Sequence, residues 1–431
     1  MNLTFKKEQS QFNLGIPPHF ILTIEHFMKK CYSHPMNTLV ALCQIGAEKI
    51  LGNEIKKLGY TLKDMGSPRP LGRVTFVGDD DALFRSNLCL RTADRVYLQL
   101  ASYKAEDFDA LFDSVYSIPW QDFFYKDVRV VVDKVRSHKS RLSSEHSIQG
   151  IVHKAIYTKL GDVWKIHTMP ESGDRNDVRI YIENNIVTVL LDLSGVPLHR
   201  RGYRKDGGIA PIRETMAAVL LQLMNWRRKT PLHDPFCGSG TIASEAMLYA
   251  YNVAPGFGRR FALENLKVYD EARAYEIKCQ EAEKIQPECQ TRITGTDIDP
   301  DAVERARANA ERAGVTAGRA LQLIGSDQRI QRPDFDQADF RDLGAPYDTG
   351  LLLGNPPYGE RLEDAESAQL LYKDMAELFD AFPGWDMGFI TSRDDFETHL
   401  GRKANSTKKL KGGNLDTYFY QFIQSQQKEK K

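Results

Sequence analysis

An unusual turn follows a short apolar run near the carboxyl end of the chain. The run Leu-Leu-Leu-Gly (351–354) has the length of a buried strand, and the turn reads Asn-Pro-Pro-Tyr (355–358). Open α/β sheets hold their active sites at the carboxyl ends of such strands. Proline fixes the φ angle and has no N–H group, so Asn355 and the Pro356 carbonyl form a stiff pair of acceptors beside a tyrosine ring. The pair suits a planar base with an exocyclic amino group, although a lone Asn-Pro-Pro sequence is more often an ordinary turn.

A second motif lies upstream and favours the chemical interpretation. It reads Asp-Pro-Phe-Cys-Gly-Ser-Gly-Thr (234–241) and leads into a helical pattern from Ile242 to Tyr251. Glycines at a strand-to-helix turn let a ligand approach the backbone, and the helix N-terminus offers free N–H groups. The third glycine of the dinucleotide fingerprint is missing. The next acid that ends a strand is Asp297, whose carboxylate can accept both ribose hydroxyls of a nucleoside cofactor.

These motifs have the order and spacing of a class I S-adenosylmethionine (SAM)-dependent methyltransferase. The chain closely resembles one family, the THUMP-domain RNA guanine-N2 methyltransferases, from about Met36 to its end. The most specific string is Gly-Asn-Pro-Pro-Tyr-Gly-Glu-Arg (354–361). The other matching strings are Leu-His-Arg-Arg-Gly-Tyr-Arg (198–204), Ala-Pro-Ile-Arg-Glu (210–214), Asp-Pro-Phe-Cys-Gly-Ser-Gly-Thr (234–241), Thr-Asp-Ile-Asp (296–299) and Ala-Asp-Phe-Arg-Asp (338–342).

The resemblance implies a fold, a cofactor and a reaction. The fold is α/β, with a C-terminal Rossmann-like class I methyltransferase sheet preceded by an α+β ferredoxin-like and THUMP RNA-binding module. The implied cofactor is SAM, and no metal is implied. The implied reaction methylates the exocyclic N2 amine of a guanosine in 23S rRNA, as in the bacterial branch. The implied RNA partner is 23S rRNA or a ribosomal precursor, and tRNA is the alternative substrate. DNA amino-methyltransferases and protein glutamine methyltransferases share the Asn-Pro-Pro-Tyr turn and are more distant alternatives.

The resemblance also assigns residues to the site. An acid and an apolar neighbour after the third strand bracket the adenine in class I methyltransferases, which favours Asp339 and Phe340 over the competing acids Asp327 and Asp336. The implied catalytic residues are Asn355, Pro356, Pro357 and Tyr358. The implied cofactor-binding residues are Glu214, Asp234, Pro235, Cys237, Gly238, Gly240, Thr241, Asp297, Ile298, Asp339, Phe340 and Asn355.

Composition is that of an ordinary globular protein. The 431 residues are 42% apolar, and 58 basic residues balance 58 acidic ones, so net charge gives no hint of nucleic acid. Six cysteines without a C-x-x-C pair suggest neither a zinc site nor a disulfide framework. We expect reduced thiols, a cytoplasmic location and no membrane contact. The predicted division is an N-terminal extension at 1–36, with Met36 as an alternative start, a ferredoxin-like part at 37–105, a THUMP RNA-binding domain at 106–195 and a methyltransferase domain at 196–431.

Apolar periodicity predicts the elements that position these residues. A hairpin at 178–183 and 186–191 about Asn184-Asn185 alternates cleanly, with its apolar residues on one face. One helix is predicted from Ala210 to Trp226 with Pro211 in its first turn. Another begins at Pro300 and stops at Gly314, before a strand at 321–325. Further predictions are helices at 47–58, 148–160, 367–379 and within the insert 253–291, and strands at 37–42, 73–77, 95–101, 128–133, 387–391 and 418–422.

Three basic stretches have two interpretations each. Residues 126–141 carry six basic side chains against two acids, residues 199–205 contain no acid, and residues 402–411 carry five cations. Each stretch could contact RNA phosphates. The alternatives are a solvated charged face for 126–141, a charged linker for 199–205 and a solubilising loop for 402–411.

Overall fold

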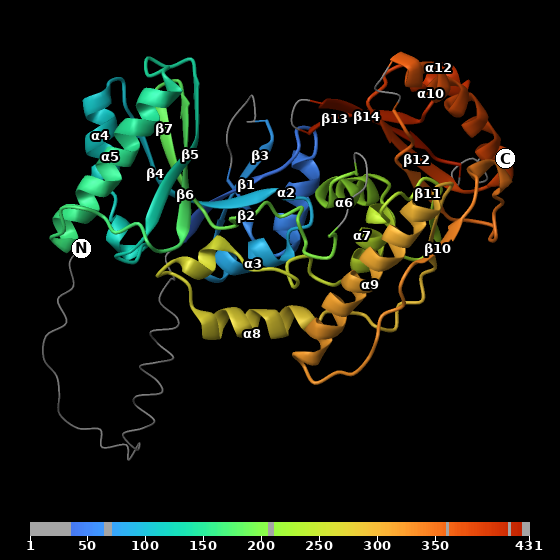
Figure 1. Cartoon of the computed structure of the whole chain (residues 1–431), viewed down its shortest axis with the longest axis horizontal. Coiled ribbons are helices and arrows are strands. Elements are labelled where there is room, and N and C mark those ends of the chain that lie inside the picture. Colours follow the sequence, from blue (N-terminus) through green and yellow to red (C-terminus); the bar gives the residue numbers. More distant parts are fainter. Residues whose placement is uncertain (1–35, 64–70, 206–210, 359–361, 413–414, 425–431) are drawn as a thin grey trace, which may run out of the picture. The chain divides into compact units, whose positions relative to one another are not determined.

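The computed structural model describes residues 36–63, 71–205, 211–358, 362–412 and 415–424 (Figure 1). Residues 37–431 form one compact unit. Three predicted features lie outside the described residues: the extension at 1–36, apart from Met36, the first residue (Ala210) of the string 210–214, and the end (359–361) of the most specific string. In the described part of the chain, no helix is long and apolar enough to cross a membrane.

Residues 37–192 build a seven-stranded sheet in the order β2-β3-β1-β4-β7-β6-β5. β5 and β6 are parallel, and the other neighbours are antiparallel. Because β4 pairs with both β1 and β7, a single sheet runs through the parts predicted as ferredoxin-like and THUMP. The strands are β1 (Asn37–Leu42), β2 (Thr61–Leu62), β3 (Arg73–Gly78), β4 (Arg95–Lys104), β5 (Arg129–His138), β6 (Arg175–Glu183) and β7 (Ile186–Asp192). The helices are α2 (Glu48–Lys57), α3 (Asp81–Cys89), α4 (Phe108–Tyr116), η1 (Trp120–Asp122) and α5 (Glu145–Trp164).

The predicted hairpin is confirmed as β6 and β7. Its two turn residues, Asn184 and Asn185, have φ angles of 50° and 62°. Two-residue hairpin turns need such positive angles, which asparagine tolerates. Val178 lies opposite Leu191, and both side chains are fully buried. The alternation in the sequence therefore marks the face that packs into the core.

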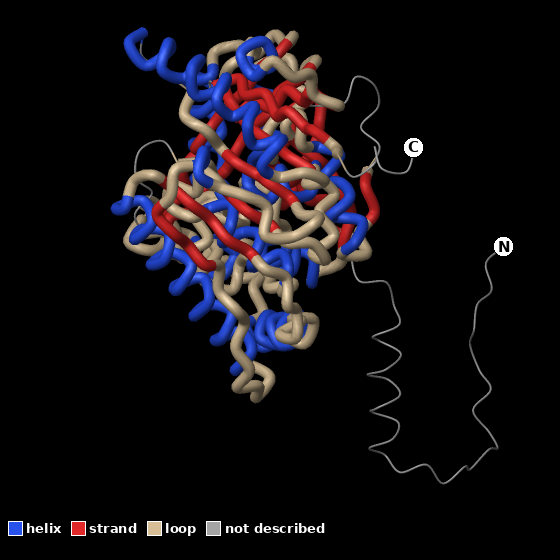
Figure 2. The backbone as a smooth tube through the Cα atoms, turned by 90° about the vertical axis from the view of Figure 1, so that its right-hand side faces the viewer, coloured by secondary structure: helices blue, strands red, loops and turns tan. Residues whose placement is uncertain are grey.

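The C-terminal sheet has the order β10-β9-β8-β11-β12-β14-β13. The first five of these strands are parallel, while β14 and β13 are antiparallel to their neighbours. Helices lie on both sides of the strands (Figure 2). The strands are β8 (Leu232–Asp234), β9 (Ile293–Asp297), β10 (Asp334–Gln337), β11 (Leu351–Gly354), β12 (Asp386–Thr391), β13 (Ser406–Gly412) and β14 (Leu415–Phe422). The helices are α6 (Glu214–Leu223), α7 (Thr241–Ala250), η2 (Ala262–Asn265), α8 (Glu271–Ala282), α9 (Pro300–Gln322), η3 (Phe340–Asp342), α10 (Leu362–Asp374), η4 (Met375–Glu377), α11 (Leu378–Ala381) and α12 (Phe396–Leu400).

The prediction that a helix stops at Gly314 is wrong. Helix α9 begins at Pro300 with Asp299 as its cap, as expected, but it continues to Gln322. A glycine inside a helix costs only about 1 kcal/mol relative to alanine, and burial of Ala317 and Leu321 on the helix face offsets that cost. The predicted strand at 321–325 is therefore the end of this helix and the turn after it. The third strand of the sheet is β10.

Other boundaries also need correction. α6 begins at Glu214, because the chain before it stays extended and the Ile212 carbonyl accepts a hydrogen bond from Arg204. Pro211 thus precedes the helix, and Ala210 lies outside the described residues. The insert 253–291 contains only α8 and η2 as helices, since prolines and glycines interrupt its first part. Residues 402–411 are mostly strand β13 and not a turn, and the helix expected at 367–379 is α10, η4 and α11.

Candidate active site

Two glycines shape the loop between β8 and α7. Gly238 and Gly240 have φ angles of +51° and +74°, which favour glycine, and the Gly240 N–H donates to the Cys237 carbonyl at 2.7 Å. A Cβ atom on Gly240 would lie 2.9 Å from that of Ala306, whereas a Cβ on Gly238 would meet nothing within 4 Å. Gly240 therefore lets α9 pack against the loop, and Gly238 leaves backbone open to a ligand.

Asp297 ends β9 and binds this loop. Its Oδ2 accepts the Gly238 N–H at 2.8 Å, and its Oδ1 accepts the Asp299 N–H at 3.0 Å. An ionised carboxylate has about four acceptor positions, so both oxygens keep capacity for further donors. The next residue, Ile298, exposes 66% of its surface. Asp297 and Ile298 together present a carboxylate and an apolar surface beside the open Gly238 backbone.

Asp234 lies beneath the loop and is fully buried. Its Oδ1 accepts the Phe236 N–H at 3.1 Å. Burial raises the pKa of Asp234 to about 8, and the charge of Asp297 adds to this shift. Burial also raises the pKa of the Cys237 thiol, so Cys237 is not an activated nucleophile. These two side chains support the loop from inside.

The Asn-Pro-Pro-Tyr turn lies against the same loop. β11 pairs with β8 in parallel, which brings their carboxyl ends together. At Gly354, a Cβ atom would lie 3.1 Å from the ring of Phe236 and 3.4 Å from Pro235, so the missing side chain allows this close approach. Asn355 is half-buried, and its Oδ1 accepts the Tyr358 hydroxyl at 2.5 Å. In the same turn, Pro356 is buried and Pro357 is exposed.

A buried tyrosine that the sequence did not reveal supports this turn. The hydroxyl of Tyr372, on α10, lies 2.8 Å from the Pro357 carbonyl, to which it donates, and 3.0 Å from the hydroxyl of Thr391 at the end of β12. Tyr372 is fully buried. In the sequence it is one apolar residue of a helical pattern, and only the pairing of β11 with β12 brings the three residues together.

The acid predicted at the adenine follows the corrected third strand. β10 ends at Gln337, and Asp339 caps the short helix η3 directly after it. Its carboxylate accepts from the backbone N–H of Arg341 at 3.0 Å and from its guanidinium at 2.9 Å. Phe340 is 6% exposed and packs on Phe236 with a ring separation of 5.2 Å. The competitor Asp336 lies within β10.

Glu214 belongs to a buried ion-pair network. Arg204 donates to the Glu214 carboxylate at 2.9 Å and to the Thr241 hydroxyl at 3.3 Å. Burial raises the pKa of Glu214 to about 7. Nearby, Arg201 and Tyr203 both contact Glu245 of α7. Within the stretch 199–205, Arg201, Tyr203 and Arg204 therefore have a structural role. Both interpretations of this stretch, as an RNA contact and as a charged linker, fail for these three side chains.

Comparison with known proteins shows the family to which the chain belongs. The model of the RMKL-like methyltransferase domain matches residues 201–421, the RlmL ferredoxin-like domain matches 38–97, and the THUMP domain matches 105–192. A Bacillus subtilis protein named "Putative RNA methyltransferase YpsC" is 38% identical over 89% of this chain and 95% of its own length. The chain belongs to the RMKL-like methyltransferase family.

Two further comparisons concern length and structure. The Marinomonas ribosomal RNA large subunit methyltransferase K/L is 30% identical over 88% of the chain, and the chain spans about half (52%) of it. The crystal structure of a possible methylase from Clostridium difficile has a TM-score of 0.81 at 36% identity, covering 90% of this chain and 98% of that one. SMU.472, solved in complex with SAH, has a TM-score of 0.78 at 35% identity, covering 90% and 98%.

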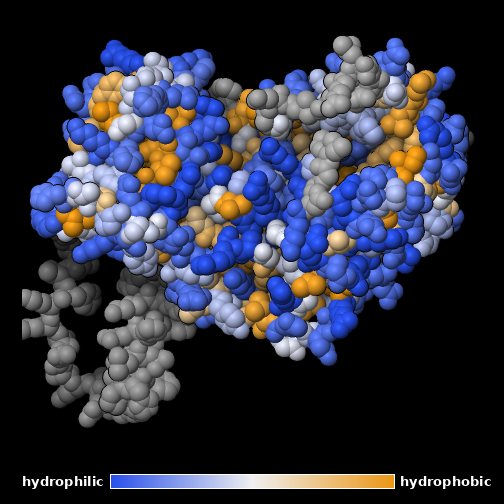
Figure 3. Space-filling model, viewed as in Figure 1, coloured by the Kyte–Doolittle hydropathy of each residue, from blue (hydrophilic) through white to orange (hydrophobic). Residues whose placement is uncertain are grey.

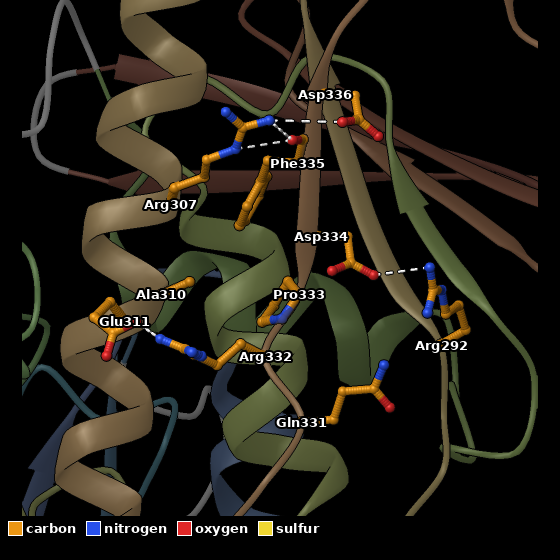
Figure 4. Close-up of a pocket in the computed structure, with 10 residues that line it drawn as sticks. All are labelled: Arg292, Arg307, Ala310, Glu311, Gln331, Arg332, Pro333, Asp334, Phe335 and Asp336. Carbon is orange, nitrogen blue, oxygen red and sulfur yellow. Dashed lines mark hydrogen bonds and ion pairs between the residues drawn. The ribbon is translucent and has the colours of Figure 1, made fainter.

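A cleft of about 650 Å³ between α9 and β10 lies away from this methyltransferase site (Figure 4). It is lined by residues at the amino ends of β9 and β10, whereas the site lies at their carboxyl ends. The three arginines of the cleft are ion-paired with three acids, namely Arg292 with Asp334, Arg307 with Asp336 and Arg332 with Glu311. The cleft thus offers no uncompensated charge for a ligand. Among the described residues, no His, Cys, Asp or Glu side chains are grouped to hold a metal ion.

Proposed function

We propose that this methyltransferase moves a methyl group from SAM to the exocyclic N2 amine of a guanosine in large-subunit ribosomal RNA. The observation that carries the proposal is the contact between the Asn355 turn and the Gly238 loop at one edge of the sheet. The RNA substrate is supported by the name of the B. subtilis relative and by the THUMP match at 105–192. The large-subunit target is supported by the names of the K/L relatives.

The residues at the loop fit SAM. Gly238 leaves space for close approach to the backbone, and Asp297 keeps free acceptor positions for the two ribose hydroxyls. The exposed Ile298 offers an apolar surface to the adenine. In this proposal Asp339 accepts from the adenine amino group, and Phe340, which is 6% exposed, contacts the adenine ring only through this small exposed surface. Glu214 and Thr241, both tied to Arg204, shape the pocket at the other end of the cofactor.

The catalytic contribution of the Asn355 turn is orientation. When bound, SAM supplies an electrophilic methyl group on a sulfonium. The amine lone pair of guanine is delocalised into the ring, so Asn355 Oδ1 and the Pro356 carbonyl must accept the two N–H groups and turn the lone pair out of the ring plane. Tyr358 stacks on a base turned out of its helix. Such positioning is worth roughly 7–11 kcal/mol in well-aligned systems. Because a methylated aryl ammonium is strongly acidic, the surplus proton passes to water without a protein base.

The test is transfer of labelled methyl from SAM to unmodified 23S rRNA, 16S rRNA, bulk tRNA and duplex DNA in parallel, followed by nucleoside analysis. We expect label in 23S rRNA as N2-methylguanosine. Label in tRNA would support the same mechanism but would show that the substrate is tRNA, as in the other branch of the family. Label in DNA as N6-methyladenine would favour the activity printed for a Listeria relative, a predicted DNA methylase that is 35% identical. SAM binding without label in any nucleic acid would reject naked RNA as the substrate and point to a protein substrate or to a ribosomal precursor.

A further inference from the structure

Strand β13 gathers basic side chains at the outer edge of the C-terminal sheet. It pairs with β14 and is the last strand in the sheet order. Lys409 and Lys411 expose 56% and 46% of their side chains, and Arg402, just before the strand, exposes 44%. Lys403 is exposed and Lys408 is half-buried. Asp416 and Asp380 pair with members of this group, but the basic side chains outnumber these acids.

The strand pairings carry Lys409 and Lys411, but not Arg402 and Lys403, to the edge of the sheet that holds the site. Thr391, the last residue of β12, lies opposite Tyr418 of β14, and Tyr418 lies opposite Lys409. Thr391 is also the residue whose hydroxyl contacts Tyr372 beneath the Asn355 turn. Neighbouring strands lie about 4.8 Å apart, so the Lys409 backbone is about 10 Å from that of Thr391. Lys411 lies still further toward the carboxyl edge.

The same strand contacts the N-terminal part of the chain. The Ile45 N–H donates to the Lys411 carbonyl at 3.2 Å, and the Lys411 N–H donates to the Ile45 carbonyl at 3.0 Å. Ile45 follows β1, and Figure 1 shows β13 reaching toward β3 and α2. The basic strand thus lies between the sheet that contains the THUMP match and the site. A nucleic acid held by the first and methylated at the second can therefore run along β13.

An aromatic ring accompanies the charges. Lys409 Nζ lies 5.5 Å from the ring centroid of Tyr418, which is half-buried. Alternating cations and aromatic faces suit single-stranded nucleic acid, whose phosphates and bases they contact in turn. The face seen in Figure 3 is mostly hydrophilic, with apolar residues only in small separate patches. Lysines on an edge strand also oppose strand addition by another protein, so charge complementarity favours a polyanion as the occupant.

We propose that Lys409 and Lys411 of β13 bind the phosphate backbone of the RNA substrate between the N-terminal sheet and the methylated base. This inference rests on the proposed function and adds the path of the RNA to it. The contacts are independent of sequence, since lysine reads phosphate charge and not base identity. The target base is then selected elsewhere, and β13 delivers the strand to the Asn355 turn.

The test compares two doubly substituted proteins with the wild type. K409Q/K411Q removes two charges from β13, and the matched control K49Q/K56Q removes two exposed charges from α2. Affinity for an unmodified 23S rRNA transcript is measured with SAH present, over a range of salt concentrations. For K409Q/K411Q we expect about a ten-fold weaker Kd at 0.1 M salt and a salt dependence that is smaller by about 0.7–0.9 per lost contact. The control should match the wild type, and SAH affinity and melting temperature should be unchanged in both.

Two outcomes overturn the inference. One is that K409Q/K411Q keeps the RNA affinity and the salt dependence of the wild type. This would mean that the lysines serve only to prevent aggregation through the edge strand. The other is an equal loss in K49Q/K56Q, which would mean that any lysine pair contributes through overall charge. Failure of the wild type itself to bind or methylate any RNA would instead reject the proposed function, and the β13 contact with it.

Discussion

The acceptor oxygen of Asn355 is the atom on which the proposed reaction depends. We predict that Asn355→Ala lowers kcat for methyl transfer by at least about 10²-fold, because a contact made only in the transition state is lost. SAH affinity should stay nearly the same, since Gly238 and Asp297 are untouched. Single-turnover transfer of labelled methyl measures the first effect and calorimetry the second. Full activity in this variant would refute the assignment of Asn355.

A substitution at Gly238 should have the opposite effect to one at Asn355, because it should weaken cofactor binding and not the chemical step. A leucine there would have to adopt a φ of +51° and would fill the space where a Cβ meets nothing within 4 Å. We predict that Gly238→Leu weakens SAH binding by about 100-fold or more. Gly325 is a matched control, because it has a φ of +70° and equally open surroundings but lies in the turn after α9. If Gly325→Leu weakened SAH binding as much, backbone strain would explain the loss.

The buried carboxyl group of Asp234 makes the stability of the fold depend on pH. Its pKa is about 8 in the folded chain, against an ordinary value of 3.8. The folded state therefore holds a proton that the unfolded chain releases, and stability falls as pH rises through the window from about 4 to 8. Asparagine can still accept the Phe236 N–H but does not ionise. We predict that the melting temperature of Asp234→Asn, relative to wild type, rises between pH 5 and pH 8 in the absence of cofactor, and parallel profiles would contradict this.

At the scale of elements, apolar periodicity predicted most strands but misjudged where α9 ends. Gly314 looks like a stop in the sequence, yet Ala317 and Leu321 continue the buried face beyond it. Because of this error, the third strand is expected at 321–325 instead of at Asp334–Gln337. The acid that binds the adenine is then ambiguous. With β10 in place, Asp339 is the acid that directly follows the strand. Local patterns cannot show such a choice, because it depends on which segment pairs with β9.

Helix α10 has a function that its sequence pattern does not show, namely to hold the Asn355 turn. Tyr372→Phe removes the hydroxyl that contacts both Pro357 and Thr391. We predict a fall in kcat of about 10- to 100-fold with unchanged SAH affinity, because a small displacement of a catalytic loop is costly. Loss of these two hydrogen bonds should lower the free energy of unfolding by only about 0.5–1.5 kcal/mol each.

Tyr420 provides the matched control for this element. It is also buried, and its hydroxyl donates to the Arg393 carbonyl at 3.0 Å, in the same apolar cluster. Tyr420→Phe should lose a similar amount of stability and keep its kcat. Equal losses of kcat in the two variants would mean that Tyr372 contributes only to packing.

At the scale of the whole molecule, residues 37–431 form one compact unit. One apolar cluster runs from Leu39 in β1 to Phe419 in β14. The stretch 199–205 reads as an exposed basic linker, but Arg201 is 3% exposed and joins helix α7 to the loop before β4. Charge composition could not reveal this, because the compensating Glu245 is 44 residues away in the sequence.

The Arg201–Glu245 pair should therefore couple the two halves in unfolding. Arg201 also donates to the carbonyls of Leu198 and Arg91, the latter in the N-terminal part. Removing one partner of a buried pair leaves an uncompensated charge, at a cost of about 3–5 kcal/mol. We predict that the wild type melts in one transition, that Arg201→Met and Glu245→Gln each lower its midpoint strongly, and that the double variant loses clearly less than the sum. Additive losses, or two separate transitions in the wild type, would mean that the halves fold independently and that the network is only a local support of α7.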